Sequence, residues 1–524
     1  MKRIIYNLVI LISLISTLSS CKKSLENDYL NPQSVEDGSI DRVFSSMLLN
    51  RRIQPTYWDF RTFILPATGA FSQVTAAESA SNMWIPSLDY GQDRWTDFYS
   101  ASPGIINEYT EMNTLYNALT DAEKSAQYVY LELGKIVLYD QAAQMIDLWG
   151  DIPFSEANSL NSSDRTVHQA VFDDAATLYN SFIDSLDNIN TYLSSYTPST
   201  VTTASLKKQD LIYTGDLTGW QKYANSLRLR LLMRISNVSE SSAKTSITTM
   251  LNDPSTYPLI ESNDDNAVLP MSPTTFNSDI LSAFTDNSGQ YSFAPTYLID
   301  SFMSANNDPR LPFYWNKTSS GTDSGTYKGM PIAAGSGVYN TGVGKYSTYD
   351  SATFMYNYNV PGVLFTASES EFLKAEAYQR WNLGDPTSVY ESGIRSSINF
   401  YYSIQNGAIF NARTFTKDAE PTETAIASYL AEDDIALTGT ATNKLIKIYK
   451  QKWEHFFILQ AGQAWAEVRR TGYPKLTFYT ASNSNASQPP MRLLYPSTEK
   501  LYNTNYSSVE SKDTRDTKIF WDIN

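Results

Sequence analysis

The sequence is poor in the residues that build metal sites and disulfide bonds. Its 524 residues include one cysteine, Cys21, and two histidines, His168 and His455. A single cysteine excludes an intramolecular disulfide and any zinc or iron–sulfur site made from several cysteines. The two histidines are far apart in the sequence, and neither stands in a nucleophile–base motif.

The sequence also lacks an excess of positive charge and a second long apolar run. It has 40 Lys and Arg against 55 Asp and Glu, a formal charge of −15 at pH 7, and no basic cluster. This balance excludes the electrostatic footprint of a nucleic-acid-binding protein. Beyond the N-terminus, no apolar stretch approaches the roughly 20 residues that a membrane-spanning helix needs. With 42% hydrophobic residues, the composition is typical of a folded globule.

The N-terminus has the pattern of a bacterial lipoprotein signal. Lys2 and Arg3 precede a mostly apolar stretch over 4–18, and the tetrapeptide Leu-Ser-Ser-Cys ends at Cys21. A short basic segment before a short apolar one indicates a signal peptide, and the tetrapeptide resembles a lipobox. We therefore expect a signal peptide over 1–20, lipid on Cys21, a flexible tether over 21–40 and a single domain over 41–524. The alternative is an ordinary secretory signal with an incidental cysteine.

Aromatic residues are abundant, at 13% of the chain, with 36 Tyr, 10 Trp and 23 Phe. Tyr and Trp each combine an apolar ring with a polar group, so they suit surfaces that are half exposed or that stack on polar ligands. The alternative is that these rings fill the contacts between helices.

Helical periodicity and capping signals predict an all-α fold. The predicted long helices cover about 120–150, 166–193, 217–235, 368–384, 385–401 and 443–470. Two helices joined by a turn at Gly384 and Asp385 resemble a tetratricopeptide-type hairpin, so we expect such pairs to form a curved scaffold. Long irregular loop regions, about 54–102 and 252–366, should lie on one side with a few short strands. One strand is expected at Tyr314 and Trp315, after a turn at Asp308.

Five phrases along the chain carry a family resemblance. They occur at 145–157, 307–312, 366–377, 451–453 and 464–474, and they read MIDLWGDIPFSEA, NDPRLP, TASESEFLKAEA, QKW and AWAEVRRTGYP. In this order, behind a lipobox, they make the chain similar to the SusD/RagB family of outer-membrane nutrient-binding lipoproteins. Most of these residues end helices or form turns, so we expect them to hold the fold rather than contact a ligand.

The resemblance implies a location, a partner and a ligand. Such proteins are lipid-anchored on the outer membrane and face the cell exterior, where each covers a SusC-like TonB-dependent transporter. They bind oligosaccharides, or in some cases peptides, on their irregular loops and catalyse no reaction. No cofactor is expected. Some relatives bind calcium, and the acidic segment 261–265 could hold a cation, although it has no Asp-x-Asp-x-Asp pattern.

The two loop regions contain the residues that suit a sugar. Aromatic rings stack on the C–H face of a sugar, while amides and guanidinium groups bond its hydroxyls. The predicted stacking rings are Trp84, Tyr90, Tyr339 and Tyr346, and the predicted hydroxyl-binding residues are Arg94 and Asn340. For each of these residues, packing within the loop is the alternative.

Three other functions remain open from the sequence. The chain could be a peptide-binding member of the same family, or a surface lipoprotein that only docks other proteins. It could also be a helical glycoside hydrolase lipoprotein, because 55 acidic residues make some carboxylate pair inevitable. Release of reducing sugar would distinguish the hydrolase from a binding protein.

Overall fold

A computed structural model describes most of the chain after residue 37. The described residues are 38–76, 84, 88–100, 103–159, 169–274, 276–285, 293–331, 342–410, 413–478 and 486–524, without the side chains of 88–90. The predicted signal peptide and Cys21 therefore lie outside the described residues.

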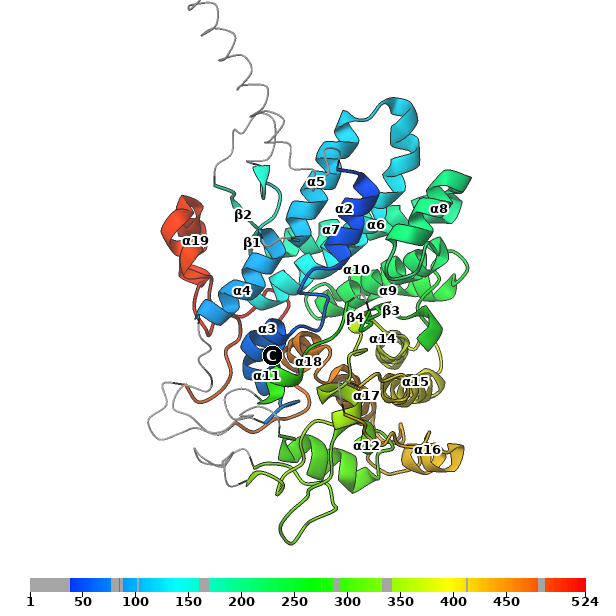
Figure 1. The fold of residues 1–524 in the computed structure, drawn as a ribbon, viewed down its shortest axis with the longest axis vertical. Helices are drawn as coiled ribbons and strands as arrows, with labels where there is room; N and C mark the ends of the chain where they lie inside the picture. The colour runs from blue at the N-terminus through cyan, green and yellow to red at the C-terminus, as the bar shows by residue number, and fades with distance from the viewer. Residues whose placement is uncertain are drawn as a thin grey trace, which may run out of the picture.

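Long helices make up one side of the molecule (Figure 1). They are α2 (Ile40–Leu48), α5 (Ile105–Ala118), α6 (Asp121–Trp149), α7 (Ala175–Ser195), α8 (Thr200–Gln209), α9 (Leu217–Ile235), α10 (Glu240–Asn252), α14 (Ala367–Trp381), α15 (Pro386–Asn406), α16 (Glu423–Leu430), α17 (Ala441–Phe456) and α18 (Ala461–Thr471). Neighbours pack in pairs such as α7 with α9 and α14 with α15. This arrangement confirms the all-α prediction.

Shorter elements occupy the other side and one end. The helices among them are α3 (Tyr57–Asp59), η1 (Phe60–Gly69), α4 (Leu88–Tyr99), η3 (Asn263–Asp265), α11 (Leu281–Thr285), η5 (Tyr297–Met303), η6 (Ser304–Asn306), α12 (Leu311–Tyr314), η7 (Ser351–Met355), α19 (Ser497–Tyr502), η8 (Thr504–Ser508) and η9 (Glu510–Lys512). Two antiparallel pairs join β1 (Ile152–Pro153) to β2 (Phe172–Asp173) and β3 (Ala267–Leu269) to β4 (Gly362–Phe365).

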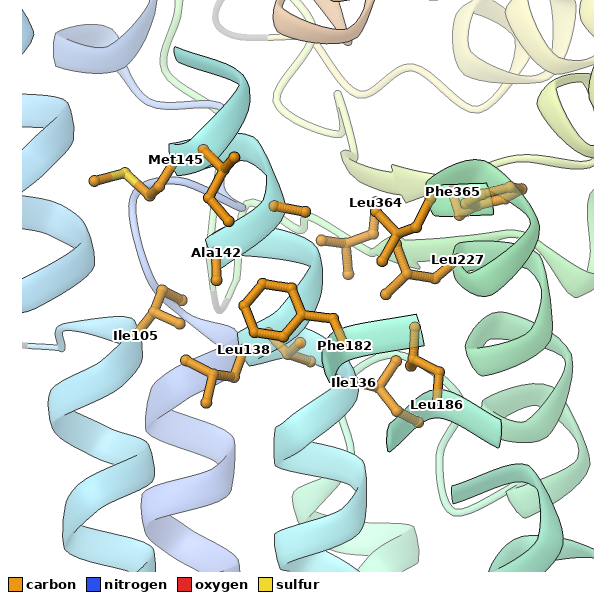
Figure 2. Close-up of a cluster of buried hydrophobic side chains, with 14 of the residues drawn as sticks. Ile105, Ile136, Leu138, Ala142, Met145, Phe182, Leu186, Leu227, Leu364 and Phe365 are labelled. Carbon is orange, nitrogen blue, oxygen red and sulfur yellow. The ribbon is translucent and has the colours of Figure 1, made fainter. Parts of the chain in front are cut away.

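Two clusters of buried apolar side chains hold these elements together. The first includes Leu138 of α6, Phe182 of α7 and Leu227 of α9, and Leu227 lies beside Leu364 of β4 (Figure 2). The second lies around α15, α17 and the short helices α11 and α12. Burial of such side chains stabilises each by roughly 1.5–3 kcal/mol.

Helix α14 lies between the two clusters. Its residues from Ala367 to Ala377 are all buried, with Leu373 in the first cluster and Phe372 in the second. A helix buried all round must satisfy its polar side chains internally. Glu369 of α14 accordingly receives a hydrogen bond of 2.6 Å from Arg230, and Glu376 receives two from Arg470.

Several predicted helix boundaries agree with the structure. Helix α9 has the predicted bounds, and Asp385 caps α15 with Pro386 in its first turn. The capping box of α6 at Thr120 is present, and Gly150, with a φ of 79°, ends that helix.

Other predictions were wrong, mostly where tertiary contacts override periodicity. The predicted helix 443–470 is two helices, α17 and α18, because the backbone breaks at Phe457 with a φ of 40°. The helix predicted from 166 begins only at Ala175, where Asp174 provides the cap. Tyr314 ends helix α12 rather than forming a strand, and Trp315 makes only an isolated bridge to Tyr349.

The region 54–102 is also less irregular than predicted, because η1 and α4 occupy much of it. Ten of its residues, Phe60–Gly69, form a π-helix that contains Pro66. A candidate site in this region therefore stands on helices.

Candidate functional site

The structure separates the six residues that the sequence singled out. Trp84 is 4% exposed and packs edge-to-face on Phe478 at 5.1 Å between ring centroids, so its ring belongs to the core and does not face a ligand. Tyr346 is half-buried and packs on Phe293 at 6.0 Å. Apolar contact with neighbouring segments explains both positions, and composition alone does not reveal such contact.

The remaining candidates differ in how much the structure describes. Tyr339 and Asn340 lie outside the described residues, and for Tyr90 only its place in the backbone of α4 is described. Arg94 is described in full: it lies on α4, is 7% exposed and forms an ion pair of 3.0 Å with Asp59. Of the predicted set, Arg94 alone is shown to line a surface groove.

That groove lies where α3 and η1 meet α4, and we call it the Trp58 groove. It has a volume of about 260 Å³. Its lining residues are Arg51, Trp58, Asp59, Thr62, Phe63, Asp93, Arg94 and Asp97. Both charge signs and one large exposed ring therefore line a single hollow.

Local hydrogen bonds hold the backbone around Trp58 at the start of α3. The Thr56 side chain caps the helix by accepting from the backbone N–H of Asp59 at 3.4 Å. The Thr62 hydroxyl donates to the carbonyl oxygen of Trp58 at 2.6 Å, and Tyr57 supports the indole edge-to-face at 4.9 Å. The side chain of Trp58 nevertheless stays 54% exposed. An exposed tryptophan on a supported helix is a fixed platform for stacking.

The wall behind Trp58 is an incompletely satisfied charge cluster. Arg94 donates through Nη1 to Asp59, and its carbonyl oxygen accepts from Arg52 at 2.9 Å. Its Nε is buried and has no hydrogen-bond partner. Arg94 also lies over the ring of Phe63, at 5.4 Å from the centroid. A buried donor without a partner is uncommon, and because this atom is shielded from solvent it lies behind the surface of the groove.

Two carboxyl groups in this wall are destabilised as anions. Burial raises the pKa of Asp59, and the neighbouring Arg94 and Arg52 oppose that rise. Burial also raises the pKa of Asp97, with a further rise from the charge of Asp59. Among the described residues, the Asp97 carboxylate has no hydrogen-bond or ion-pair partner. An unpaired acceptor thus lines the same groove as an exposed ring.

The six residues predicted from the sequence include neither Asp97 nor Trp58. A helix prediction over 88–99 would have placed Asp93, Arg94 and Asp97 on one face, because positions i, i+1 and i+4 share a side of an α-helix. Reading this segment as a loop hid that pattern.

The described residues give little support for a metal centre. They contain no group of three or more His, Cys, Asp or Glu that could hold an ion. In the acidic segment 261–265, Asp265 is paired with Lys222 at 2.7 Å and accepts from the Ser262 hydroxyl. Within the described part of the chain, no helix is long and apolar enough to cross a membrane.

Comparison with known families decides the identity of the fold. A family model described as starch-binding and associating with the outer membrane, SusD-like, matches residues 47–496. The chain belongs to the SusD-like family. The family predicted from the five phrases is thereby confirmed. No curated protein matches the sequence significantly.

Solved structures share the architecture of this SusD-like chain. A chitin-binding protein superimposes with a TM-score of 0.75 at 23% identity, over 92% of this chain and 99% of that one. A chitin-binding SusD homologue from Flavobacterium johnsoniae has a TM-score of 0.72 at 20% identity, over 93% and 99%. A SusD homologue from Bacteroides uniformis has a TM-score of 0.72 at 22% identity, over 93% and 100%. At these identities the likeness shows the fold.

Proposed function

We propose that the protein binds an uncharged oligosaccharide in the Trp58 groove at the cell surface. It is anchored in the outer membrane through lipid on Cys21, faces the exterior, and passes the oligosaccharide unaltered to a SusC-like TonB-dependent transporter. Membership of a starch-binding, outer-membrane-associated family supports the ligand class and the location. The transporter is proposed on the family resemblance.

The observation that carries this proposal is the exposed ring of Trp58 beside unoccupied polar groups. A sugar ring offers a C–H face to an indole and hydroxyls at its rim to planar donors and acceptors. The Asp97 carboxylate can accept a hydrogen bond from a hydroxyl group, and the guanidinium-bearing residues Arg51 and Arg94 also line the groove. Trp58, Asp97 and these two arginines therefore supply the three kinds of contact that a sugar requires.

The charge of the groove favours a neutral ligand. Arg51 and Arg94 stand against Asp59, Asp93 and Asp97, so the lining has cations and anions in nearly equal number. An anionic polysaccharide would meet three carboxylates, and a cationic peptide would meet two guanidinium groups. Chitin-type and starch-type oligosaccharides are uncharged, and the two chitin-binding structures of the same fold support testing the former first.

Isothermal titration calorimetry on protein lacking residues 1–21 tests the proposal. Chitohexaose and maltohexaose are the probes, and a tryptic peptide mixture is the alternative ligand. We expect at least one hexasaccharide to bind, and Trp58→Ala to weaken the binding at this groove at least tenfold, which corresponds to about 1.4 kcal/mol. Trp58→Phe should retain part of the affinity because it keeps a ring.

A matched control is Phe276→Ala, since Phe276 is also a partly exposed aromatic and does not line the groove. The Phe276→Ala protein should bind the hexasaccharide with the affinity of the wild type. Binding of peptides but of neither sugar would replace the ligand class. Release of reducing sugar during incubation with either hexasaccharide would contradict delivery of an unaltered ligand.

A further inference from the structure

A second groove lies on the other flank of α4. It has a volume of about 490 Å³ and is bounded by α4, the chain after β1, residues 169–170 and α19. Helix α19 packs against α4 (Figure 1). We call this hollow the Tyr502 groove.

One helix supplies both grooves from opposite faces. The Tyr502 groove takes Gln92, Trp95, Thr96 and Tyr99 from α4, whereas the Trp58 groove takes Asp93, Arg94 and Asp97 from it. With 3.6 residues per turn, these two sets point in nearly opposite directions. The two grooves are therefore separate hollows with α4 between them.

The polar lining of the Tyr502 groove is almost uncharged. Its uncharged polar residues are Gln92, Thr96, Ser100, Asn158, Gln169, Thr498 and Asn503. Glu499 is the only acidic residue that lines it, and no Lys, Arg or His does. Without a cation it offers no pairing for a phosphate or carboxylate, and one carboxylate is too few for a metal site. Amides and hydroxyls suit a ligand that carries hydroxyl groups and no charge.

Hydrogen bonds between distant segments hold the far wall of the groove in place. Gln169 donates through Nε2 to the carbonyl oxygen of Tyr502 at 2.8 Å and accepts from the backbone N–H of Thr504 at 3.0 Å. Asn503 donates to the carbonyl oxygen of Ala170 at 3.0 Å. A wall that is already ordered loses little conformational freedom when a ligand binds.

The groove also has unoccupied groups for a ligand. The ring of Tyr502 is 73% exposed, and among the ring contacts of the described residues it has no partner. The side chains of Gln92 and Thr96 make no hydrogen bond to the described residues, although both line the hollow. A stacking ring and free hydrogen-bonding groups thus occur together here as well.

We propose that the Tyr502 groove is a second binding site for an uncharged oligosaccharide, with Tyr502 as the stacking ring and Gln92 and Thr96 at the hydroxyls. This inference rests on the proposed function only for the class of ligand, because the residues of the Tyr502 groove are distinct from those of the Trp58 groove. A glycan chain long enough to engage both sites dissociates more slowly than one held at a single site, because the second contact forms within the same complex.

Calorimetric titration with chitohexaose and maltohexaose tests this site on protein lacking residues 1–21. The variants are Trp58→Ala, Tyr502→Ala and the double substitution. We expect two sites of wild-type affinity in the wild type, one in each single variant and none in the double variant. In the Trp58→Ala background, Tyr502→Ala should weaken the remaining site at least tenfold, and Tyr502→Phe should weaken it less than threefold. Thr96→Ala in that background is a second, independent probe.

The outcomes separate this inference from the proposed function. If Trp58→Ala abolishes all binding, the second site is overturned while the Trp58 groove stands. If Trp58→Ala changes nothing and Tyr502→Ala removes the binding, the Tyr502 groove is supported and the Trp58 groove is overturned. If neither hexasaccharide binds the wild type, both sites are overturned as oligosaccharide sites.

Discussion

Arg470 and Arg94 are both buried beside carboxylates, but their hydrogen bonding differs. Every guanidinium nitrogen of Arg470 donates to Glu376 or Glu467, at 2.7–3.2 Å. Arg94 donates to Asp59 through Nη1, and its Nε has no partner.

The difference separates an arginine whose pairing is complete within the fold from one whose pairing is incomplete. Arg470 lies on α18, in the phrase at 464–474, and its ion pair with Glu376 links α18 to α14. Together with Glu467, this partner uses every guanidinium nitrogen of Arg470. Arg94 lies beside an exposed indole at a surface groove. A residue type alone does not indicate a ligand site; incomplete pairing next to an accessible hollow does.

The largest expected effect comes from removing the fully paired guanidinium. Arg470→Met leaves Glu376 and Glu467 buried with less compensation, so we expect the free energy of unfolding to fall by about 3–5 kcal/mol. Urea denaturation followed by circular dichroism measures it. The stability of Arg470→Lys should lie between those of the wild type and Arg470→Met, because lysine keeps the charge but not the bidentate geometry. An Arg470→Met protein as stable as Arg94→Met would remove the contrast between the two arginines.

A smaller effect is expected from the pH dependence of stability around Arg470. Buried Glu376 has a pKa lowered to about 2, because Arg470 and Lys452 outweigh the effect of burial. Its folded pKa lies below the unfolded value, so its contribution to stability is complete above about pH 4.5 and is lost as the pH falls toward 2. Between pH 6 and pH 3 this amounts to about 2 kcal/mol.

Urea denaturation of the wild type and Glu376→Gln at pH 6 and pH 3 measures this contribution. The stability difference between the two proteins should shrink by about 2 kcal/mol at the lower pH. A constant difference would show that Glu376 does not titrate in this range.

The smallest of these stability changes is expected from substitution of Asp97, which should stabilise the protein rather than destabilise it. Burial raises the pKa of Asp97, so folding disfavours its charged form. Asp97→Asn should therefore raise the free energy of unfolding at pH 7, by less than about 1 kcal/mol, while weakening hexasaccharide binding. Asp184→Asn, an exposed substitution on α7, should change stability by less than about 0.5 kcal/mol.

The affinity for the hexasaccharide should also depend on the protonation of Asp97. Wild-type affinity should fall as the pH drops through the raised pKa of Asp97, at a pH above its ordinary value of 3.8, because the protonated carboxyl loses acceptor capacity. Asp97→Asn should flatten this profile. A steep profile that survives the substitution would assign the titration to another group.

Local signals in the sequence were sufficient for much of the scaffold. Large side chains recur at helical spacing along α9, and α15 has both a capping Asp385 and Pro386, so their starts could be predicted. The break between α17 and α18 could not, because periodicity continues across it and only the positive φ of Phe457 interrupts the helix.

The candidate site was less predictable because burial depends on distant segments. Trp84 and Trp58 both lie in the region that was predicted to be a loop. Trp84 packs on Phe478, which is near the other end of the chain, whereas Trp58 remains exposed. No local pattern distinguishes them. Arg94 was selected as a polar residue among aromatics, and its pairing with Asp59 depends on α4 packing against η1.

The position of α14 links the two halves of the molecule thermodynamically. Because its adjacent residues Phe372 and Leu373 belong to different clusters, neither half can melt without exposing the apolar side chains that α14 buries in the other. We therefore expect the two halves to unfold as a single cooperative unit.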